Sequence, residues 1–180
     1  MYRKYIKRIL DIVVSLILIV ITFPIMLFVA IALYLNLGRP LHNEKRMREG
    51  LNKKPFLMYK FRTRKINTYH MPYRQRYTNF SYFIDRTHLN ELPQLFNVLK
   101  GDMSLVGPRP FIPGEKLPSK PPKERYLVRP GMTSLATLHG VATITHNEKL
   151  KYDIEYYNKL SFLLDLKIFI LTPFVLLKFK

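Results

Sequence analysis

The sequence predicts a mainly α-helical protein with a small β element, held at a membrane by its N-terminal segment. Three observations lead to this fold class. Residues 12–35 form an uncharged apolar run, basic residues flank this run on both sides, and helical patterns occur within 88–100 and 146–160. A chain of 180 residues has room for one compact core rather than two.

The apolar run of 24 residues is long enough to cross a bilayer core of about 30 Å at about 1.5 Å per residue. It is longer than the apolar part of a secretory signal, which has about 7–15 residues and ends in small residues. Pro24 lies inside the run, where it removes a backbone hydrogen bond and kinks a helix.

Basic residues flank this run on both sides. They are Arg3, Lys4, Lys7 and Arg8 before it, and Arg39, Lys45, Arg46, Arg48, Lys53 and Lys54 after it. Basic flanks favour the cytoplasmic face, so a re-entrant helix that breaks near Pro24 and returns to the same face explains both ends. An ordinary transmembrane helix with a proline kink is the alternative, and the residues alone leave both open.

Two segments follow the membrane element. Residues 54–63 are typical of a short strand or extended segment leading into a basic stretch. Lys and Arg alternate with tyrosines between positions 60 and 76, which suits either a lipid headgroup interface or a solvated loop.

Leucine and phenylalanine recur at helical spacing over residues 88–100, which predicts an amphipathic helix ending at Gly101. Pro93 is tolerated in the opening turns of such a helix, because an amide there has no partner to lose. Asn90 and Glu91 then lie at the helix start, where the dipole favours a negative group.

The last third of the chain contains three further elements. Six prolines within residues 108–122 indicate a stiff loop. Residues 146–160 are predicted to form an amphipathic helix. Residues 161–180 are strongly apolar but contain Asp165, Lys167 and Pro173, a pattern that favours a helix lying in the membrane interface over a second span.

The net charge of +18 at pH 7 indicates an anionic partner: nucleic acid, a lipid surface or a phosphorylated substrate. The apolar run argues against nucleic acid, and we expect none. The chain has no cysteine, so disulfides and thiolate metal sites are absent, which fits a reducing compartment.

Several motifs occur in one order along the chain. They are Lys7-Arg8, the run broken at Pro24, residues 54–63, the long stretch Leu89 to Pro110, Arg129-Pro130-Gly131 and residues 156–168. In this order the chain closely resembles the bacterial sugar transferases, the small monotopic phosphoglycosyl transferases.

The resemblance implies an activity and a location. Such proteins transfer a sugar-1-phosphate from a UDP-sugar to polyprenol phosphate with Mg²⁺, on the cytoplasmic face of the bacterial plasma (inner) membrane, and so prime exopolysaccharide, capsule or glycan synthesis. It also favours the re-entrant helix broken at Pro24, with Lys7 and Arg8 at the membrane. The expected segments are 1–38 in the membrane, 39–160 as the cytoplasmic catalytic-like domain and 161–180 as an interfacial helix.

The resemblance further assigns site residues. Position 90 corresponds to the family's aspartate nucleophile, which forms a covalent phosphosugar intermediate, and Glu91 to a glutamate that activates the lipid phosphate or binds the metal. Four basic residues match positions expected to bind substrate: Lys60, Arg62, Arg109 and Arg129. Arginine suits this role because its planar fork pairs with phosphate oxygens.

The sequence departs from the family pattern at the site itself. Asn90 replaces the aspartate, Ser134 replaces a glycine, and Val141 replaces an arginine. An amide has no nucleophilic oxygen, so two interpretations stay open. The chain is either an active transferase or a catalytically impaired relative that serves as a membrane scaffold or regulator. The oligomeric state is not predicted.

Overall fold

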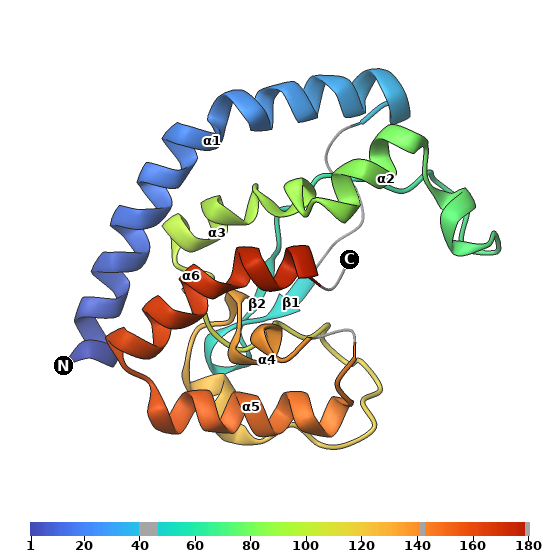
Figure 1. Ribbon diagram of the computed structural model, residues 1–180. Coiled ribbons are helices and arrows are strands. Elements are labelled where there is room, and N and C mark those ends of the chain that lie inside the picture. The colour runs from blue at the N-terminus through green and yellow to red at the C-terminus, as the bar shows by residue number, and fades with distance from the viewer. Residues whose placement is uncertain (40–46, 141–142, 179–180) are drawn as a thin grey trace.

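A computed structural model describes residues 1–39, 47–140 and 143–178 of the chain. Its longest element is α1 (Lys7–Leu37), which follows a short π-helical turn at Tyr2–Ile6. α1 takes a curved path around the other elements and contains Pro24 (Figure 1). The structure therefore has one continuous curved helix at the position where the sequence predicts a break, and the re-entrant path stays a prediction.

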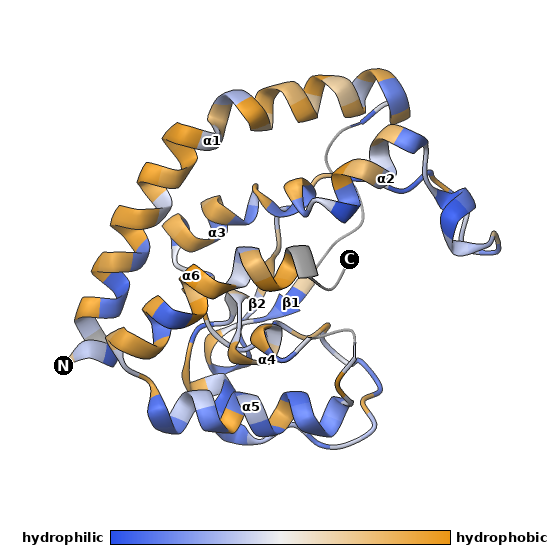
Figure 2. Cartoon of the chain, viewed as in Figure 1, coloured by the Kyte–Doolittle hydropathy of each residue, from blue (hydrophilic) through white to orange (hydrophobic). Residues whose placement is uncertain are grey.

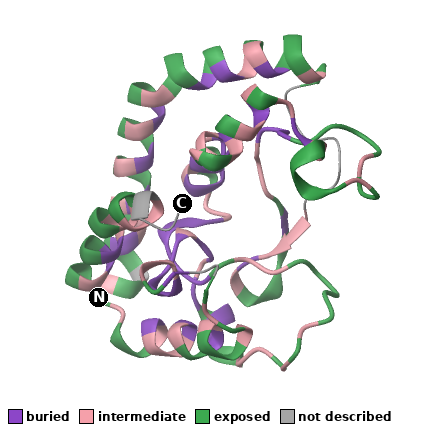
Figure 3. Ribbon diagram, turned by 45° about the vertical axis from the view of Figure 1, so that its right-hand side comes forward, coloured by how far each residue is buried: buried purple, intermediate pink, exposed green. Residues whose placement is uncertain are grey.

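α1 presents two different surfaces. A stripe at helical spacing is buried against the rest of the protein: Lys7, Asp11, Ser15, Ile19, Met26, Val29 and Leu33. Its other faces are coloured as hydrophobic and exposed (Figures 2 and 3), and the side chains of Val20, Phe28 and Leu35 are exposed there. In the part of the chain that the structure describes, α1 is the one helix long and apolar enough to cross a membrane. Exposed apolar surface on this scale fits contact with lipid.

The β structure consists of two short pairs. β1 (Met47–Glu49) is antiparallel to β2 (Pro55–Leu57), with Arg48 opposite Phe56. β3 (Ser104–Val106) is parallel to β4 (Gly131–Thr133). A side chain on Gly107 or Gly131 would collide with the backbone of the facing segment, so these two glycines permit the close approach of the two motifs that contain them.

The helix predicted over 88–100 begins later in the structure than the sequence indicated, so its predicted start was wrong. After α2 (Asn79–Arg86), His88 adopts a left-handed conformation with φ 59°, and Leu89–Glu91 form a 3₁₀ turn. α3 (Gln94–Lys100) begins after Pro93 and ends at Gly101. The apolar spacing continues through both because side chains three apart lie on one side of a 3₁₀ turn as well. Asn90 and Glu91 therefore belong to the turn and precede the α-helix.

The C-terminal helices agree with the sequence more closely. α4 (Leu135–Leu138) is short, α5 (His146–Lys159) confirms the helix predicted over 146–160, and α6 (Phe162–Lys178) contains Pro173. Further 3₁₀ turns are Leu51–Lys53, Tyr73–Arg76 and Lys123–Leu127. The proline-rich segment 108–122 has no helix or strand, as predicted.

One core joins the two ends of the chain. α1 packs on α2, α3 and β3, while α6 packs on α4, β3 and β4 (Figure 1). Val29, Val98, Met103 and Ile168 are at most 1% exposed within this core. Since α6 buries Ile168, only part of its surface is available to a membrane interface, and its placement there stays a prediction.

Candidate active site

The central feature of the site is an ion pair between Lys60 and Glu91. The Lys60 Nζ lies 2.7 Å from the Glu91 Oε1. Lys60 follows β2 and Glu91 ends the 3₁₀ turn before α3. Their side chains are 17% and 26% exposed, so the pair is largely shielded but still open to a ligand.

Glu91 is held in its ionised form. Burial is the largest single effect and raises the pKa of its carboxyl. The charge and hydrogen bond of Lys60, together with the charges of Arg109 and His88, outweigh burial and bring that pKa below its usual value. Glu91 is therefore a carboxylate at neutral pH, suited to accept a proton or to bind a cation rather than to donate a proton.

Asn90 is oriented differently from its neighbour. It is 1% exposed, and its Nδ2 donates to the Asp85 Oδ1 at 2.7 Å. Its backbone carbonyl accepts from the Phe61 amide at 2.9 Å. The Asn90 Oδ1 is buried without a hydrogen-bond partner among the described residues. Buried polar atoms are almost always paired, so this oxygen has the capacity to receive a further donor or a cation.

The predicted basic residues divide between different places. Arg109 is exposed between Pro108 and Pro110, and its charge acts on Glu91. Arg62 is 5% exposed. Its guanidinium donates to the Leu37 carbonyl and, at 3.1 Å, to that of Arg39, which caps the C-terminal end of α1. The structure therefore brings Lys60, Glu91 and Arg109 together and places Arg62 elsewhere, and substrate binding by Arg62 stays a prediction.

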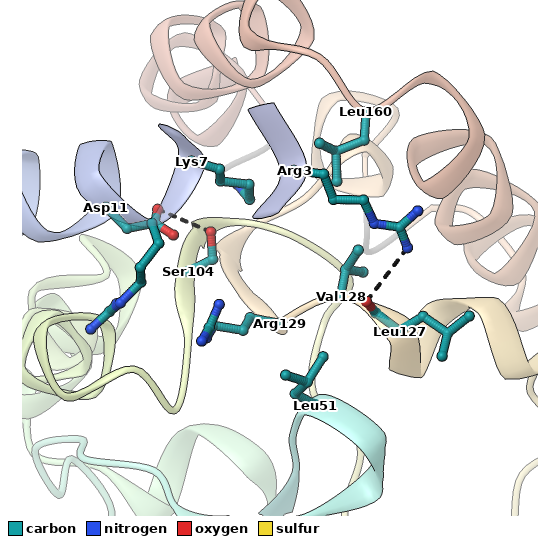
Figure 4. Close-up of a pocket in the computed structure, with 10 residues that line it drawn as sticks. Arg3, Lys7, Asp11, Leu51, Ser104, Leu127, Val128, Arg129 and Leu160 are labelled. Carbon is teal, nitrogen blue, oxygen red and sulfur yellow. Dashed lines mark hydrogen bonds between the residues drawn. The ribbon is translucent and has the colours of Figure 1, made fainter. Parts of the chain in front are cut away.

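Lys7, Arg8 and Arg129 meet at a cationic cavity of about 350 Å³ at the other end of α3 (Figure 4). Arg3, Asp11 and Ser104 also line it, and the Asp11 Oδ1 accepts from Ser104 at 3.0 Å.

The arginines of this cavity cap α3. Arg8 donates to the Val98 and Leu99 carbonyls at 2.6 and 2.8 Å, and Arg129 donates to the Gly101 carbonyl at 2.9 Å. Cations at a helix C-terminus stabilise it through the helix dipole. Arg8 and Arg129 thus have a structural function, while substrate binding by Arg129 and membrane contact by Lys7 and Arg8 stay predictions.

An apolar groove of about 580 Å³ lies between α1 and the site. Its lining residues are Phe23, Met26, Leu27, Ala30, Tyr59, Phe61, Pro93, Phe96 and Lys100. Tyr59 and Phe61 flank Lys60 in sequence, and Pro93 lies two residues after Glu91. The groove therefore joins the exposed apolar surface of α1 to the segments that carry the ion pair.

Two polar residues of the site have no signal in the sequence. Asn97 is fully buried; its Oδ1 accepts from the Tyr59 amide and its Nδ2 donates to the Leu57 carbonyl, each at 2.8 Å. It thereby fixes the backbone next to Lys60. Asp85 accepts from Thr63 and Tyr77 as well as from Asn90. The contacts of Asn97 with Leu57 and Tyr59 and that of Asp85 with Thr63 join segments far apart in sequence, so residue spacing does not indicate them. The contact of Asp85 with Asn90 is local and depends on the left-handed conformation of His88.

Of the other two departures from the family pattern, Ser134 and Val141, the structure describes Ser134 alone. Ser134 is the N-cap of α4, and its Oγ accepts from the Thr137 amide at 3.2 Å. A serine is favoured there because it satisfies an amide that has no helical partner. Val141 lies outside the described residues.

A metal ion held by the described residues would need further ligands from a bound molecule or water. Among residues 1–39, 47–140 and 143–178 there is no cluster of three or more His, Cys, Asp or Glu side chains. The ionised Glu91 is an oxygen ligand of the type Mg²⁺ prefers, and Mg²⁺ commonly takes its other ligands from phosphates and water. The residues thus fit a magnesium ion that arrives with a phosphorylated substrate.

An apolar helix, an apolar groove and a shielded charge pair define a protein suited to bind a phosphorylated ligand beside a membrane. The family described as bacterial sugar transferase matches residues 2–179. The chain belongs to this family, as its motifs indicated.

Three relatives illustrate the relationship. EpsL of Bacillus subtilis (strain 168), described as an uncharacterized sugar transferase, is 40% identical over 172 residues, which cover 92% of this chain and 84% of the relative. A UDP-glucose:undecaprenyl-phosphate glucose-1-phosphate transferase of Xanthomonas campestris pv. campestris is 33% identical, over 92% of this chain and 37% of the relative. An undecaprenyl-phosphate galactose phosphotransferase of Salmonella typhimurium is 31% identical, over 97% and 41%. The chain spans most of EpsL but about two fifths of the other two.

Proposed function

We propose that this protein transfers a sugar-1-phosphate from a UDP-sugar to polyprenol phosphate at a membrane surface. The observation that carries the proposal is the Lys60–Glu91 pair at 2.7 Å. The charge of Arg109 acts on Glu91, and Tyr59 and Phe61, on either side of Lys60 in the chain, line an apolar groove that also contains residues of α1. This arrangement offers separate places for a diphosphate and for a lipid chain. The names of the relatives from Xanthomonas and Salmonella include undecaprenyl phosphate.

The charges suit a reaction between two phosphorylated substrates. Lys60 and Arg109 attract the diphosphate and offset its charge. A bound Mg²⁺, taken up by Glu91 together with phosphate oxygens, would supply further charge neutralisation. A covalent phosphosugar intermediate would divide the transfer into two displacements, so that the two anionic substrates need not react directly.

The acceptor would enter through the groove. Eight of the nine lining side chains are apolar or aromatic, and Lys100 is the one charged member of the set. A polyprenyl chain matches such a surface, and its phosphate would then reach the region of Lys60 and Glu91. Holding both substrates beside the same residues lowers the entropic part of the barrier by several kcal/mol, up to about 7–11 in well-oriented cases.

The proposal includes a re-entrant α1 on the cytoplasmic face of the bacterial inner membrane. The chain lacks cysteine, so single cysteines can report its topology. We expect Ile6→Cys and Leu35→Cys, which lie near opposite ends of α1, both to react with a membrane-impermeant maleimide only when the reagent has access to the cytoplasmic face. Labelling of one position from outside would show a transmembrane path instead.

A second candidate is a catalytically impaired scaffold or regulator. Asn90 favours it, because this amide is buried and bonded to Asp85, and it cannot form an acyl phosphate. The two candidates differ in one measurement, the release of UMP.

UMP release should be measured with undecaprenyl phosphate, Mg²⁺ and a panel containing UDP-glucose, UDP-galactose and their N-acetylated forms. The active transferase predicts release by the unmodified chain that depends on the lipid, and a loss of at least about 100-fold in Glu91→Gln, as expected for a lost acid–base group. UMP release by Asn90→Asp, with none by the unmodified chain for any sugar of the panel, would instead support the catalytically impaired relative.

A further inference from the structure

Asp85 is a carboxylate that lies directly beside the amide of Asn90. Its Oδ1 accepts from the Asn90 Nδ2 at 2.7 Å and from the Thr63 Oγ1 at 2.8 Å. Its Oδ2 accepts from the Tyr77 hydroxyl at 3.2 Å. The left-handed His88 reverses the chain between α2 and the 3₁₀ turn, which brings positions 85 and 90 together.

The donors to Asp85 are all uncharged. No ion pair among the described residues includes it, so its negative charge is not neutralised by a lysine or arginine in direct contact. The Oδ1 is engaged by two short hydrogen bonds, whereas the Oδ2 accepts a single longer one. The Oδ2 therefore keeps the more available electron pairs.

Exposure also separates the two residues. Asn90 is 1% exposed, while Asp85 is half-buried. A nucleophile must reach the phosphorus of its substrate, and of this pair only Asp85 has both a nucleophilic oxygen and access to the surface.

We propose that Asp85 is the nucleophile of this chain, in place of residue 90, and that Asn90 positions it. This inference rests on the proposed transferase function. The Asp85 Oδ2 attacks the phosphorus that carries the sugar and forms an acyl phosphate. The bond from that phosphorus to the bridging oxygen breaks, and UMP leaves with the electron pair. An oxygen of the lipid phosphate then attacks the same phosphorus, which releases Asp85 as a carboxylate and forms the lipid diphosphate sugar.

Peptide mapping can locate the intermediate. The unmodified protein is mixed with the UDP-sugar and Mg²⁺ without lipid, quenched, and treated with hydroxylamine, which converts an acyl phosphate into a stable hydroxamate. Trypsin cuts after Arg76, Arg86 and Lys100, so peptide 77–86 contains Asp85 as its one carboxylate side chain and peptide 87–100 contains Glu91 as its one. We expect the hydroxamate on peptide 77–86.

Variants test the same assignment. Asp85→Asn should lose both the hydroxamate and more than about 99% of UMP release, since loss of a nucleophile costs orders of magnitude. The double variant Asp85→Asn with Asn90→Asp exchanges the two groups and should regain release, with the hydroxamate now on peptide 87–100. Glu155→Gln, on the surface of α5, is the matched control and should behave like the unmodified chain. Thermal unfolding of each variant checks that it is folded.

The outcomes separate this inference from the proposed function. UMP release with the hydroxamate on peptide 87–100 of the unmodified chain, or with none at all, would overturn the role of Asp85 and leave the transferase function standing. No UMP release by the unmodified chain with any sugar of the panel would reject the transferase function, and the role of Asp85 would fall with it.

Discussion

The ammonium of Lys7 lies 2.7 Å from the Asp165 Oδ2, so an ion pair joins the first turn of α1 to α6 near the other end of the chain. Both side chains are 10% exposed. The hydroxyls of Tyr2 and Tyr156 donate to the same carboxylate at 2.6 and 2.7 Å. Both oxygens of Asp165 are thus hydrogen-bonded, and the ion pair fixes how the apolar helix α1 meets the core.

Removing Lys7 should therefore destabilise the fold. In Lys7→Met, Asp165 keeps its tyrosine donors but loses its counter-charge, and breaking a buried pair in this way typically costs about 3–5 kcal/mol. Chemical denaturation of the detergent-solubilised protein measures the change. Lys159→Met is the control, because it breaks an exposed pair with Glu155 on one helix and should cost about 0.3–0.5 kcal/mol. Equal losses in both variants would show that burial of the Lys7 pair contributes nothing.

Asp153 should make stability depend on pH. Burial raises the pKa of this carboxyl to about 6, although Arg125, at 3.0 Å, lowers it in part. The unfolded value is about 3.9. The folded state therefore binds the proton more tightly, and the stability that Asp153 contributes is present below about pH 4 and is lost as pH rises through about 6.

The expected loss over this range is up to about 3 kcal/mol. Melting temperatures measured at steps from pH 4 to 7 test it, with Asp153→Asn as the comparison. The variant has no group to titrate at this position, so its curve should be flatter, whatever its absolute stability. Parallel curves for the two proteins would contradict the assignment.

The Lys60–Glu91 pair should shape the pH profile of the reaction. Lys60 lowers the pKa of Glu91, so activity that requires the carboxylate persists to acidic pH. In Lys60→Met that pKa rises, and we expect the acidic limb of kcat/KM to move to higher pH, beyond any general loss of rate. Lys116→Met, on the exposed proline-rich segment, should leave the limb in place. A limb that does not move in Lys60→Met would mean that another group controls it.

Filling the apolar groove should weaken binding of the lipid substrate and leave binding of the UDP-sugar unchanged. Ala30 lines the groove, while its neighbour Ile31 is 53% exposed and does not line it. We expect Ala30→Trp to raise the KM for undecaprenyl phosphate about tenfold, the equivalent of about 1.4 kcal/mol, with the KM for the UDP-sugar unchanged. Ile31→Trp is the matched control. The same increase in both variants would place the lipid outside the groove.

Much of the helical structure could be predicted from periodicity, and its failures have physical causes. α5 and α6 are long enough for an apolar pattern to define them. α2 is short, and the structure shows it capped by the reciprocal hydrogen bonds of Thr78 and Ser81, a local feature that the apolar pattern does not display. The helix start at residue 88 was wrong because the leucine spacing is the same on a 3₁₀ turn and an α-helix.

The sequence predicted several residues of the site but not the contacts that these residues make. The resemblance indicated Lys60, Glu91 and Arg109, which the structure brings together. It could not indicate that Arg62 caps α1, because that contact depends on tertiary packing, or that Asp85 bonds to Asn90, because that contact depends on the left-handed backbone conformation of His88. The sequence shows that position 90 carries an uncharged asparagine where the family pattern has an aspartate. Only the fold shows that the carboxylate of Asp85 lies beside that asparagine.

The capping of α1 by Arg62 has a mechanical consequence. Lys60 and Arg62 are two residues apart on one extended segment, and the first holds Glu91 while the second holds the carbonyls at the end of the apolar helix. A shift of that helix within the bilayer would pull on the same short stretch of backbone that positions the ammonium of Lys60. Under the proposed function, lipid thickness and composition would thereby alter where the ammonium of Lys60 lies relative to Glu91.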